Sequence, residues 1–328
     1  MLKIEIDNRD GRLWDISGIV SSADYKTIRN GEPSTFSFTL IKGGLYEYQA
    51  FKYAPGDVIR VTKDGAKLFF GYIFSIDSGR DEDVSITAFD QLKYLLANDY
   101  FIGIDITATE VVRRIAESFN LKVGVLEDTK YKIPRMAEDN SKLLDIICTA
   151  INHTLIATTQ MYMLFDDFGE LSLQNIQNLT LDLSLGDRSL VYDYSQKRSI
   201  EESSNRIKLV KKNKEKGVRE IYISQDNANI AKWGLLQFFQ DVDEKMNEAQ
   251  IDSTLTNLMK LKNRERRSFQ LEAIGDVRVR AGRYVSINIA ELSISQYFLV
   301  NSCSHKFDGA EHTMSLELMD IRIGDVSV

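Results

Sequence analysis

The chain has few of the residues on which cross-linking and metal chemistry depend. Its 328 residues include two cysteines, three histidines and three prolines. Cys148 and Cys303 lie far apart and form no CxxC or zinc-type spacing, so the sequence supports neither a disulfide framework nor a structural zinc site. A reducing cytoplasm suits such a chain. Because so little proline is available for stiff linkers, we expect domains that adjoin directly.

Long apolar runs are also absent. Runs such as residues 146–151 are interrupted long before the roughly 20 residues that cross a bilayer, so no membrane span is expected. The N-terminus alternates like a strand and lacks the pattern of a signal peptide, so ordinary secretion is not expected. The net charge of −7 opposes extensive nonspecific binding to nucleic acid.

Motifs of common catalytic sites are missing: the sequence contains no GxSxG, HExxH, Walker or GxGxxG pattern. The best metal candidates are Cys303 and His305, which share one strand face, and His312, which could lie across a hairpin. A hairpin tip at residues 307–311 is expected to place both histidines near solvent, and no fourth ligand is evident. We therefore assign no catalytic, cofactor-binding or metal-binding residue and expect no cofactor.

Acidic pairs are the remaining source of hydrolytic chemistry. Residues 81–83, 166–167 and 201–202 could supply the two carboxylates of a glycosidase, which must face each other across a cleft. Neighbouring residues on a strand point to opposite faces, so solvated loop positions are expected instead. A peptidoglycan hydrolase that uses Asp166 and Asp167 is the alternative function.

Two basic runs, residues 208–216 and 260–267, could contact phosphates. Both are interleaved with glutamate and lack aromatic residues for base stacking, which favours solvated loops or protein-interface charges. We expect no specific nucleic-acid partner, although a position facing a channel lumen stays open for these runs.

The first 88 residues have the texture of antiparallel β-structure. Alternating segments are separated by turn residues such as Asn30-Gly31, which predicts a small barrel or sandwich. The expected strands are residues 3–7, 34–41, 57–63, 69–78 and 84–88.

Helical periodicity then appears. A short helix is expected at residues 90–96, and a capping box from Thr107 to Glu110 opens a helix that runs to Phe119. Another helix should begin near residues 139–141. Expected strands follow at residues 155–159, 161–166 and 170–174, which makes an α+β middle domain.

The last third returns to strands. Residues 199–210 and 219–224 predict a hairpin with a basic tip at 211–217. A helix is expected at about 244–262, and strands resume from Ser268 to the end. A helix is thus inserted within a second β-domain.

An internal echo links the two β-regions. Segments 56–61, 70–77 and 83–90 resemble segments 282–287, 297–304 and 312–320. Duplication explains this echo, and the alternative is that any two β-meanders with a glycine turn look alike. Gly56 and Gly282 should then form equivalent turns whose backbone angles other residues resist.

Short segments in the same order along nearly the whole chain carry a family resemblance. They are residues 51–61, 70–73, 88–90, 201–207, 233–237, 242–250, 305–307 and 312–314. Together they resemble the XkdQ-like hub proteins of contractile phages, defective prophages and phage-tail-like bacteriocins of Gram-positive bacteria. Each motif is structural, and their collinear order carries the resemblance.

The resemblance implies a β-dominated α+β fold with two tail-tube-like antiparallel β-barrel domains that flank the middle domain. The expected domains are residues 1–98, 99–180 and 181–328, with the inserted helix in the third. The implied function is a non-enzymatic baseplate hub, a trimeric pseudo-sixfold ring that adapts the sixfold tail tube to the threefold spike. No domain follows the second barrel before Val328, so a fused hydrolase is not expected.

The implied partners are two further copies of the chain, a tail tube protein or tube initiator, the central spike protein and the surrounding baseplate proteins. A tape measure protein is a further possible partner. The resemblance also implies synthesis in the bacterial cytoplasm and incorporation into the tail baseplate of a phage or phage-tail-like particle.

Overall fold

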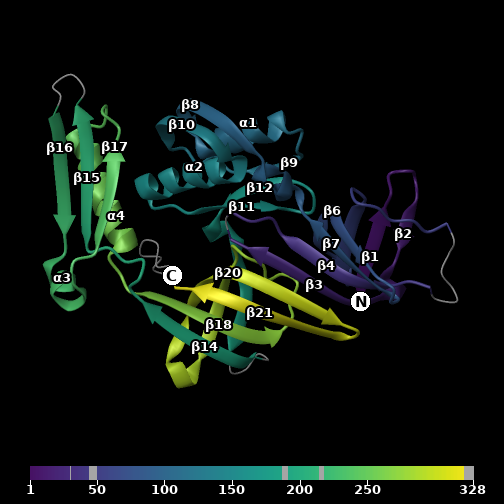
Figure 1. Ribbon diagram of the computed structural model, residues 1–328. Helices are drawn as coiled ribbons and strands as arrows, with labels where there is room; N and C mark the ends of the chain where they lie inside the picture. The colour runs from purple at the N-terminus through teal and green to yellow at the C-terminus, as the bar shows by residue number, and fades with distance from the viewer. Residues whose placement is uncertain (30, 44–49, 187–190, 214–217, 321–328) are drawn as a thin grey trace.

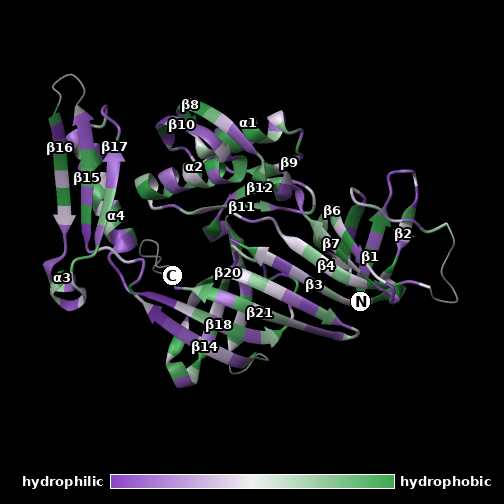
Figure 2. Cartoon of the chain, in the orientation of Figure 1, coloured by the Kyte–Doolittle hydropathy of each residue, from purple (hydrophilic) through white to green (hydrophobic). Residues whose placement is uncertain are grey.

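Strands dominate the computed structural model of the chain (Figure 1). It describes residues 1–328 except 30, 44–49, 187–190, 214–217 and 321–328, and every statement below concerns the described residues. The predicted β-dominated fold is confirmed. Hydrophobic and hydrophilic residues alternate along many strands (Figure 2), as expected where one face of a sheet is buried.

The first β-unit comprises seven strands and two 3-10 helices, of which η2 is terminal. Its predicted strands all form, and β2 and β3 are additional. The terminal 3-10 helix replaces the predicted short helix at 90–96, and the Asp90 side chain accepts the Leu92 N–H at its start. The elements are β1 (Leu2–Asp7), β2 (Leu13–Asp15), η1 (Ser17–Ile19), β3 (Val20–Ile28), β4 (Thr35–Ile41), β5 (Val58–Lys63), β6 (Ala66–Ser78), β7 (Asp83–Phe89) and η2 (Gln91–Leu96).

The middle region packs two helices against short strands. The predicted capping box is present, since Thr107 accepts the Glu110 N–H and Glu110 accepts the Thr107 N–H. The predicted hairpin through Phe168 and Gly169 also forms, and both residues have positive φ. The elements are β8 (Asn98–Thr107), α1 (Ala108–Ser118), β9 (Val123–Leu126), β10 (Lys132–Lys142), α2 (Leu143–Thr158), β11 (Tyr162–Asp166), β12 (Leu171–Asn175) and η3 (Ile176–Leu179).

One prediction in this region is wrong. Residues 155–159 do not form a strand, because α2 continues to Thr158. The Thr154 hydroxyl donates to the Ala150 carbonyl, and the Thr158 hydroxyl donates to the Thr154 carbonyl. These bonds give the threonine hydroxyls partners in the preceding turn, so both β-branched residues are accommodated within the helix. The helix also begins at Leu143, later than residues 139–141, which belong to β10.

The second β-unit contains six strands. Strand β14 was not predicted, and it accounts for residue 199, which the sequence assigned to the following hairpin. The elements are β13 (Thr180–Gly186), β14 (Val191–Ser199), β18 (Arg266–Ile274), β19 (Tyr284–Ile289), η4 (Ala290–Leu292), β20 (Ile294–Asp308) and β21 (Glu311–Met319). The predicted continuation of strands into 321–328 lies outside the described residues.

Between β14 and β18 the chain forms an arm that projects at one side of the molecule (Figure 1). The predicted hairpin and the inserted helix are both present, with residues 214–217 of the basic tip outside the described residues. Asn257 on the helix donates to the Ile156 and Ala157 carbonyls, which ties the arm to the middle region. The elements are β15 (Arg206–Asn213), β16 (Val218–Gln225), α3 (Asn227–Trp233), β17 (Gln237–Val242) and α4 (Glu248–Lys262).

The two β-units form one sheet instead of two separate closed barrels. A single path of paired strands runs β14-β18-β21-β20-β3-β4-β7-β6-β5-β1-β2, and β19 and β13 branch from β20 to complete thirteen strands. No closed barrel occurs within the described residues. The barrel arrangement predicted for each unit is therefore not found in the single chain, because β20 pairs with β3 of the other unit.

The two units have the same strand order and the same register. Strands β3, β4, β7 and β6 lie side by side in the first unit, as β14, β18, β21 and β20 do in the second. Between β4 and β7, Thr35 pairs with Phe89, and at the equivalent position between β18 and β21, Ser268 pairs with Met319. Both strand pairs continue for seven residue pairs. These pairings align the same segments that the sequence echo aligned, which supports duplication.

Irregularities recur at the same places. Strand β6 has a bulge between Ile73 and Ser75, and β20 has one between Val300 and Ser302. A further register shift occurs near the start of β3 and at the equivalent place in β14. Because a bulge inserts one residue and bends its strand, two shared bulges imply the same local geometry in both units.

Candidate functional site

The joint between the β-units is the best-defined polar site in the fold. Residues 302–308 of β20 pair antiparallel with residues 22–28 of β3, and this pairing is called the in-chain seam below. Thr27 is central to it: its hydroxyl donates to the Cys303 carbonyl at 3.4 Å and accepts the Ala281 N–H at 2.9 Å. The seam therefore connects β3, β20 and the loop before β19.

Of the two histidines of the predicted cluster, His305 lies in this seam and His312 lies beside it on β21. His305 is fully buried and His312 is 9% exposed, so the expectation that both lie near solvent is wrong. The hairpin tip forms as predicted, but aromatic rings stack on both histidines. Tyr25 stacks on His305 at 5.9 Å and Phe307 stacks on His312 at 4.3 Å between ring centroids.

The hydrogen bonds of the two imidazoles assign their protons. His305 Nε2 lies 2.8 Å from the Val279 carbonyl oxygen, which only accepts, so Nε2 carries the proton and donates. His305 Nδ1 then accepts from His312 Nε2 at 3.0 Å. Burial lowers the pKa of each histidine to about 4, so both rings are neutral at physiological pH.

The side chains of this cluster contact one another and the backbone through hydrogen bonds. Cys303 Sγ lies 3.2 Å from His305 Nε2, as the shared strand face predicted, and His312 lies across the hairpin. Both nitrogens of His305 are committed to hydrogen bonds, and burial raises the pKa of the Cys303 thiol. No group of three or more potential ligands suited to a metal ion occurs among the described residues.

A second buried polar cluster joins the middle region to both β-units. Asp90 comes from the first unit, Asp166 from the end of β11 and Arg280 from the second unit. Gln91 Nε2 donates to Asp166 Oδ2 at 2.8 Å, and Arg280 Nη2 donates to the Asp166 backbone carbonyl at 3.0 Å. Asp166 is only 4% exposed, so the prediction that it lies in a solvated loop is wrong.

The electrostatics of this cluster follow from burial. Burial raises the pKa of Asp90 to about 6, although the Ser34 and Leu92 N–H groups donate to its carboxylate. Burial and then the nearby Asp90 charge raise the pKa of Asp166 to about 7. The pair thus titrates near neutral pH. Asp90, Gln91 and Arg280 had no sequence signal for this role, because they come from two segments that are distant from Asp166 and from each other.

Equivalent glycine turns occur in both β-units, and the middle region contacts one of them. Gly56 and Gly282 have φ of +95° and +85°, and their N–H groups donate to Ile73 and Val300 at 2.8 and 2.9 Å. The predicted equivalence of these turns is confirmed. They differ in surroundings: a Cβ at Gly282 would lie 2.7 Å from Met163 of β11, whereas a Cβ at Gly56 would meet nothing.

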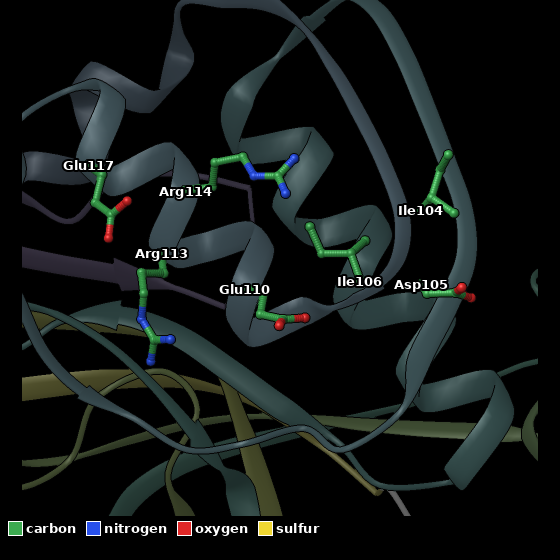
Figure 3. A pocket seen from close by; sticks show the side chains of 7 residues that line it. All are labelled: Ile104, Asp105, Ile106, Glu110, Arg113, Arg114 and Glu117. Carbon is green, nitrogen blue, oxygen red and sulfur yellow. The ribbon is translucent and has the colours of Figure 1, made fainter.

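A groove lies elsewhere, between β8 and α1. It encloses about 250 Å³, and Figure 3 shows Arg113, Arg114, Glu110 and Glu117 around it. Two of these side chains already have structural partners: Glu110 caps α1, and Arg114 donates to the Ile102 carbonyl. Neither Asp166 nor Asp167, the carboxylates of the alternative hydrolase, lines this groove.

The basic runs are distributed among ion pairs. Lys212 pairs with Asp241, and Arg266 pairs with Glu202. The Lys262 ammonium lies 4.3 Å from the centroid of the Phe238 ring. Residues 214–217 of the first run lie outside the described residues. The described part therefore offers interleaved charges, as the sequence predicted, in place of a continuous basic surface.

Comparison with known proteins gives consistent matches. The YQBQ-like family profile matches residues 23–319. Two proteins of Bacillus subtilis (strain 168) are each 24% identical over 306 residues: the uncharacterized protein YqbQ, covering 92% of both chains, and the phage-like element PBSX protein XkdQ, covering 92% of this chain and 93% of its own. A solved tail protein from Neisseria meningitidis MC58 has the same fold, with a TM-score of 0.73, 12% identity and coverage of 98% and 97% of the two chains.

No helix in the described chain is sufficiently long and apolar to traverse a bilayer.

Proposed function

Since this chain belongs to the YQBQ-like family, we propose that it is a structural baseplate protein of a contractile phage tail or phage-tail-like particle. Within that role, its function is that of a hub: three copies form a pseudo-sixfold ring that joins the sixfold tail tube to the threefold central spike. The relative XkdQ belongs to a phage-like element, and the N. meningitidis protein of the same fold is a tail protein.

The observation that carries the hub proposal is the pair of equivalent β-units. Each unit has the same strand order and register, and the in-chain seam holds them edge to edge in one sheet. One chain therefore presents two similar surfaces, and three chains would present six. A ring with that composition matches a sixfold partner on one side and a threefold partner on the other.

The partners proposed for this ring are protein surfaces. A tail tube protein or tube initiator would contact the six β-units, and the spike protein would contact features that occur once per chain. The arm and the middle region are such features. We extend the proposal to the surrounding baseplate proteins, to a tape measure protein in the lumen, and to cytoplasmic synthesis before incorporation into the baseplate. The domain limits at 98 and 180 are part of the same proposal.

The test is the mass of the purified chain in solution. Light scattering on a sizing column should give about 112 kDa, which is three times the chain mass of 37.4 kDa. Negative-stain images of the same peak should show rings with a central hole. A chain that stays monomeric at all concentrations and never joins tail particles would contradict the hub.

The proposal includes no catalytic activity. The hydrolase alternative needs Asp166 and Asp167 at a substrate cleft, but Asp166 is buried beneath the junction of the three regions. Zymography on cell walls tests this point. Clearing that disappears in Asp166→Asn or Asp167→Asn would overturn the non-enzymatic assignment.

A further inference from the structure

Two equivalent strand edges of the sheet differ in whether they are paired. The second half of β20 pairs with β3, and this pairing uses one edge of each strand. The strand equivalent to β20 is β6, and the strand equivalent to β3 is β14. Among the described residues no strand pairs with the outer edge of 74–78 in β6 or of 195–199 in β14. An open edge presents unpaired N–H and C=O groups that favour pairing with another chain.

The open edges lie at opposite ends of one run of eight strands. That run is β14-β18-β21-β20-β3-β4-β7-β6, with the in-chain seam at its middle. Joining β6 of one chain to β14 of the next would repeat the seam and extend the run without changing its direction. A heterologous contact of this kind closes into a ring when the rotation per chain allows it.

We propose that β6 of one chain pairs antiparallel with β14 of a second copy, in the register that the in-chain seam defines. This proposal rests on the trimeric hub proposed above and specifies its subunit contact. The pairings within each unit fix the equivalent residues. Tyr25 pairs with Phe36 as Gln196 pairs with Phe269, and Val300 occupies the place of Ile73.

Replacing each residue of the in-chain seam by its equivalent in β6 or β14 gives the residue pairs expected between chains. Ser302 pairs with Ile28 in the seam, and His305 pairs with Tyr25. The predicted pairs, with the β6 residue first and the β14 residue of the second copy after it, are Ser75 with Ser199, Ile76 with Arg198, Asp77 with Lys197, and Ser78 with Gln196.

The side chains at these positions suit the register. Asp77 and Lys197 are both exposed in the single chain, where Lys197 forms a solvent-exposed ion pair with Glu201. The register places the opposite charges of Asp77 and Lys197 directly across from each other. The register also explains an exposed aromatic side chain. Phe74 is 37% exposed, and at its equivalent the Asn301 carbonyl accepts the Arg29 N–H. Ile200 is the equivalent of Arg29, so Phe74 would meet an apolar side chain.

The two kinds of joint differ in chemistry. The in-chain seam buries Thr27, Cys303 and His305, each at most 2% exposed. The contact between chains would instead place Arg198 and Lys197 opposite Ile76 and Asp77. Because exposed charges are screened by salt, the contact between chains should weaken with ionic strength while the in-chain seam does not.

Cysteine pairs on the full chain test the register. Directly opposite residues alternate between hydrogen-bonded and non-hydrogen-bonded pairs, and only one class has the Cβ spacing of a disulfide. Two variants, Ser75→Cys with Ser199→Cys and Ser78→Cys with Gln196→Cys, together sample both classes. Each is made with Cys148→Ser, since Cys148 is the partly exposed native thiol. The control is Ser75→Cys with Gln196→Cys, whose residues are three positions out of register.

Mild oxidation followed by denaturing electrophoresis should give covalent dimers and trimers for at least one in-register variant, and none for the control or for single cysteines. Light scattering before oxidation separates the two proposals. A trimer in which neither in-register variant cross-links, or in which the control cross-links equally, overturns the strand pairing but keeps the hub. A chain that stays monomeric, with no cross-linking at any concentration, overturns both.

Discussion

Phe74 of β6 and Asn301 of β20 are the inserted residues of equivalent β-bulges, one in each β-unit. In both strands the extra residue follows a strand segment that pairs with the preceding strand, β5 or β19. The strand then bends and offers a new edge. In β20 that edge pairs with β3. The bulge therefore directs the second half of the strand toward the other β-unit.

The charges of the proposed contact between chains give the first prediction. Asp77→Lys alone should weaken the trimer, because it places two lysines opposite each other, and Lys197→Asp alone should do the same. The combined variant should restore the trimer. An opposite-charge cross-strand pair contributes about 0.2–1 kcal/mol, so the dissociation midpoint should move measurably with three such pairs in a ring.

Light scattering across protein and salt concentrations measures this shift. Glu117→Lys on α1 makes the same charge change at an exposed site outside the contact and serves as the control. Equal weakening by the control would mean that net charge alone sets the association.

The two equivalent glycine turns give a matched comparison of stability. Gly56→Ala and Gly282→Ala should each cost about 1–2 kcal/mol, because both residues have left-handed backbone angles. Gly282→Ala should cost about 1–3 kcal/mol more, since its new methyl group would overlap Met163. Denaturant unfolding of both variants measures the difference.

A third variant isolates the overlap. In a Met163→Ala background, the cost of Gly282→Ala should fall to the level of Gly56→Ala. If the extra cost persists there, the contact with Met163 is not its cause.

The acidic cluster predicts a loss of stability as pH rises. The folded pKa values of Asp90 and Asp166 are about 6 and 7, above the ordinary 3.8. The stabilisation from their protonated forms is therefore complete below about pH 4 and is lost as pH rises through 6 to 7. Each unit of pKa shift corresponds to about 1.4 kcal/mol. Asp166→Asn should thus show a smaller decline in unfolding free energy between pH 6 and 8 than the unmodified chain.

Asp167→Asn is the control, because the neighbouring Asp167 is exposed. The comparison is made by denaturant titration at each pH. An Asp166→Asn curve parallel to that of the unmodified chain would show that the buried pair does not titrate in this range.

His305 of the seam and its hydrogen-bonded neighbour His312 act in the opposite direction. Their folded pKa values are about 4, below the ordinary 6.5. Their neutral forms stabilise the fold above pH 6.5, and this contribution is lost as pH falls through about 4. His305→Gln combined with His312→Gln should lower stability at pH 7 and reduce the further loss between pH 6 and 4. His153→Gln is a comparison variant, because burial also lowers the pKa of this histidine, which lies outside the seam. Equal acid sensitivity of the unmodified chain and the double variant would contradict the prediction.

Sequence patterns predicted the caps, turns and helix ends that depend on residues close together in the chain. The capping box at Thr107, the turn at Phe168-Gly169 and the end of the long helix at Lys262 depend on neighbouring residues, and the structure has them. The internal echo was found because glycine turns and alternating strands recur in order. These features could be derived without any knowledge of the tertiary structure.

The joint between the units could not be derived in that way. Strand β3 buries Ala23, Tyr25 and Thr27, and small or polar residues at these positions weaken the hydrophobic alternation that marks a strand. Its partner β20 was predicted as a strand, but nothing local indicates which edge it pairs with.

Burial of Asp166 was missed for a related reason. Its cover comes from Asp90, Gln91 and Arg280, which only the folded chain brings together. The exposure of a residue can be predicted from its sequence neighbours only when those neighbours also surround it in the fold.

The in-chain seam also has a consequence for synthesis. Thr27 and Cys303 are bonded across 276 residues, so the edge of β3 has no in-chain partner until nearly the whole polypeptide has left the ribosome. Contacts of such sequence separation slow folding and leave strand edges open to wrong pairing during that interval. The small and polar residues of β3 make its edge less hydrophobic during that interval. Nascent chains should therefore pair with this edge only weakly before β20 is synthesised and forms the native pairing.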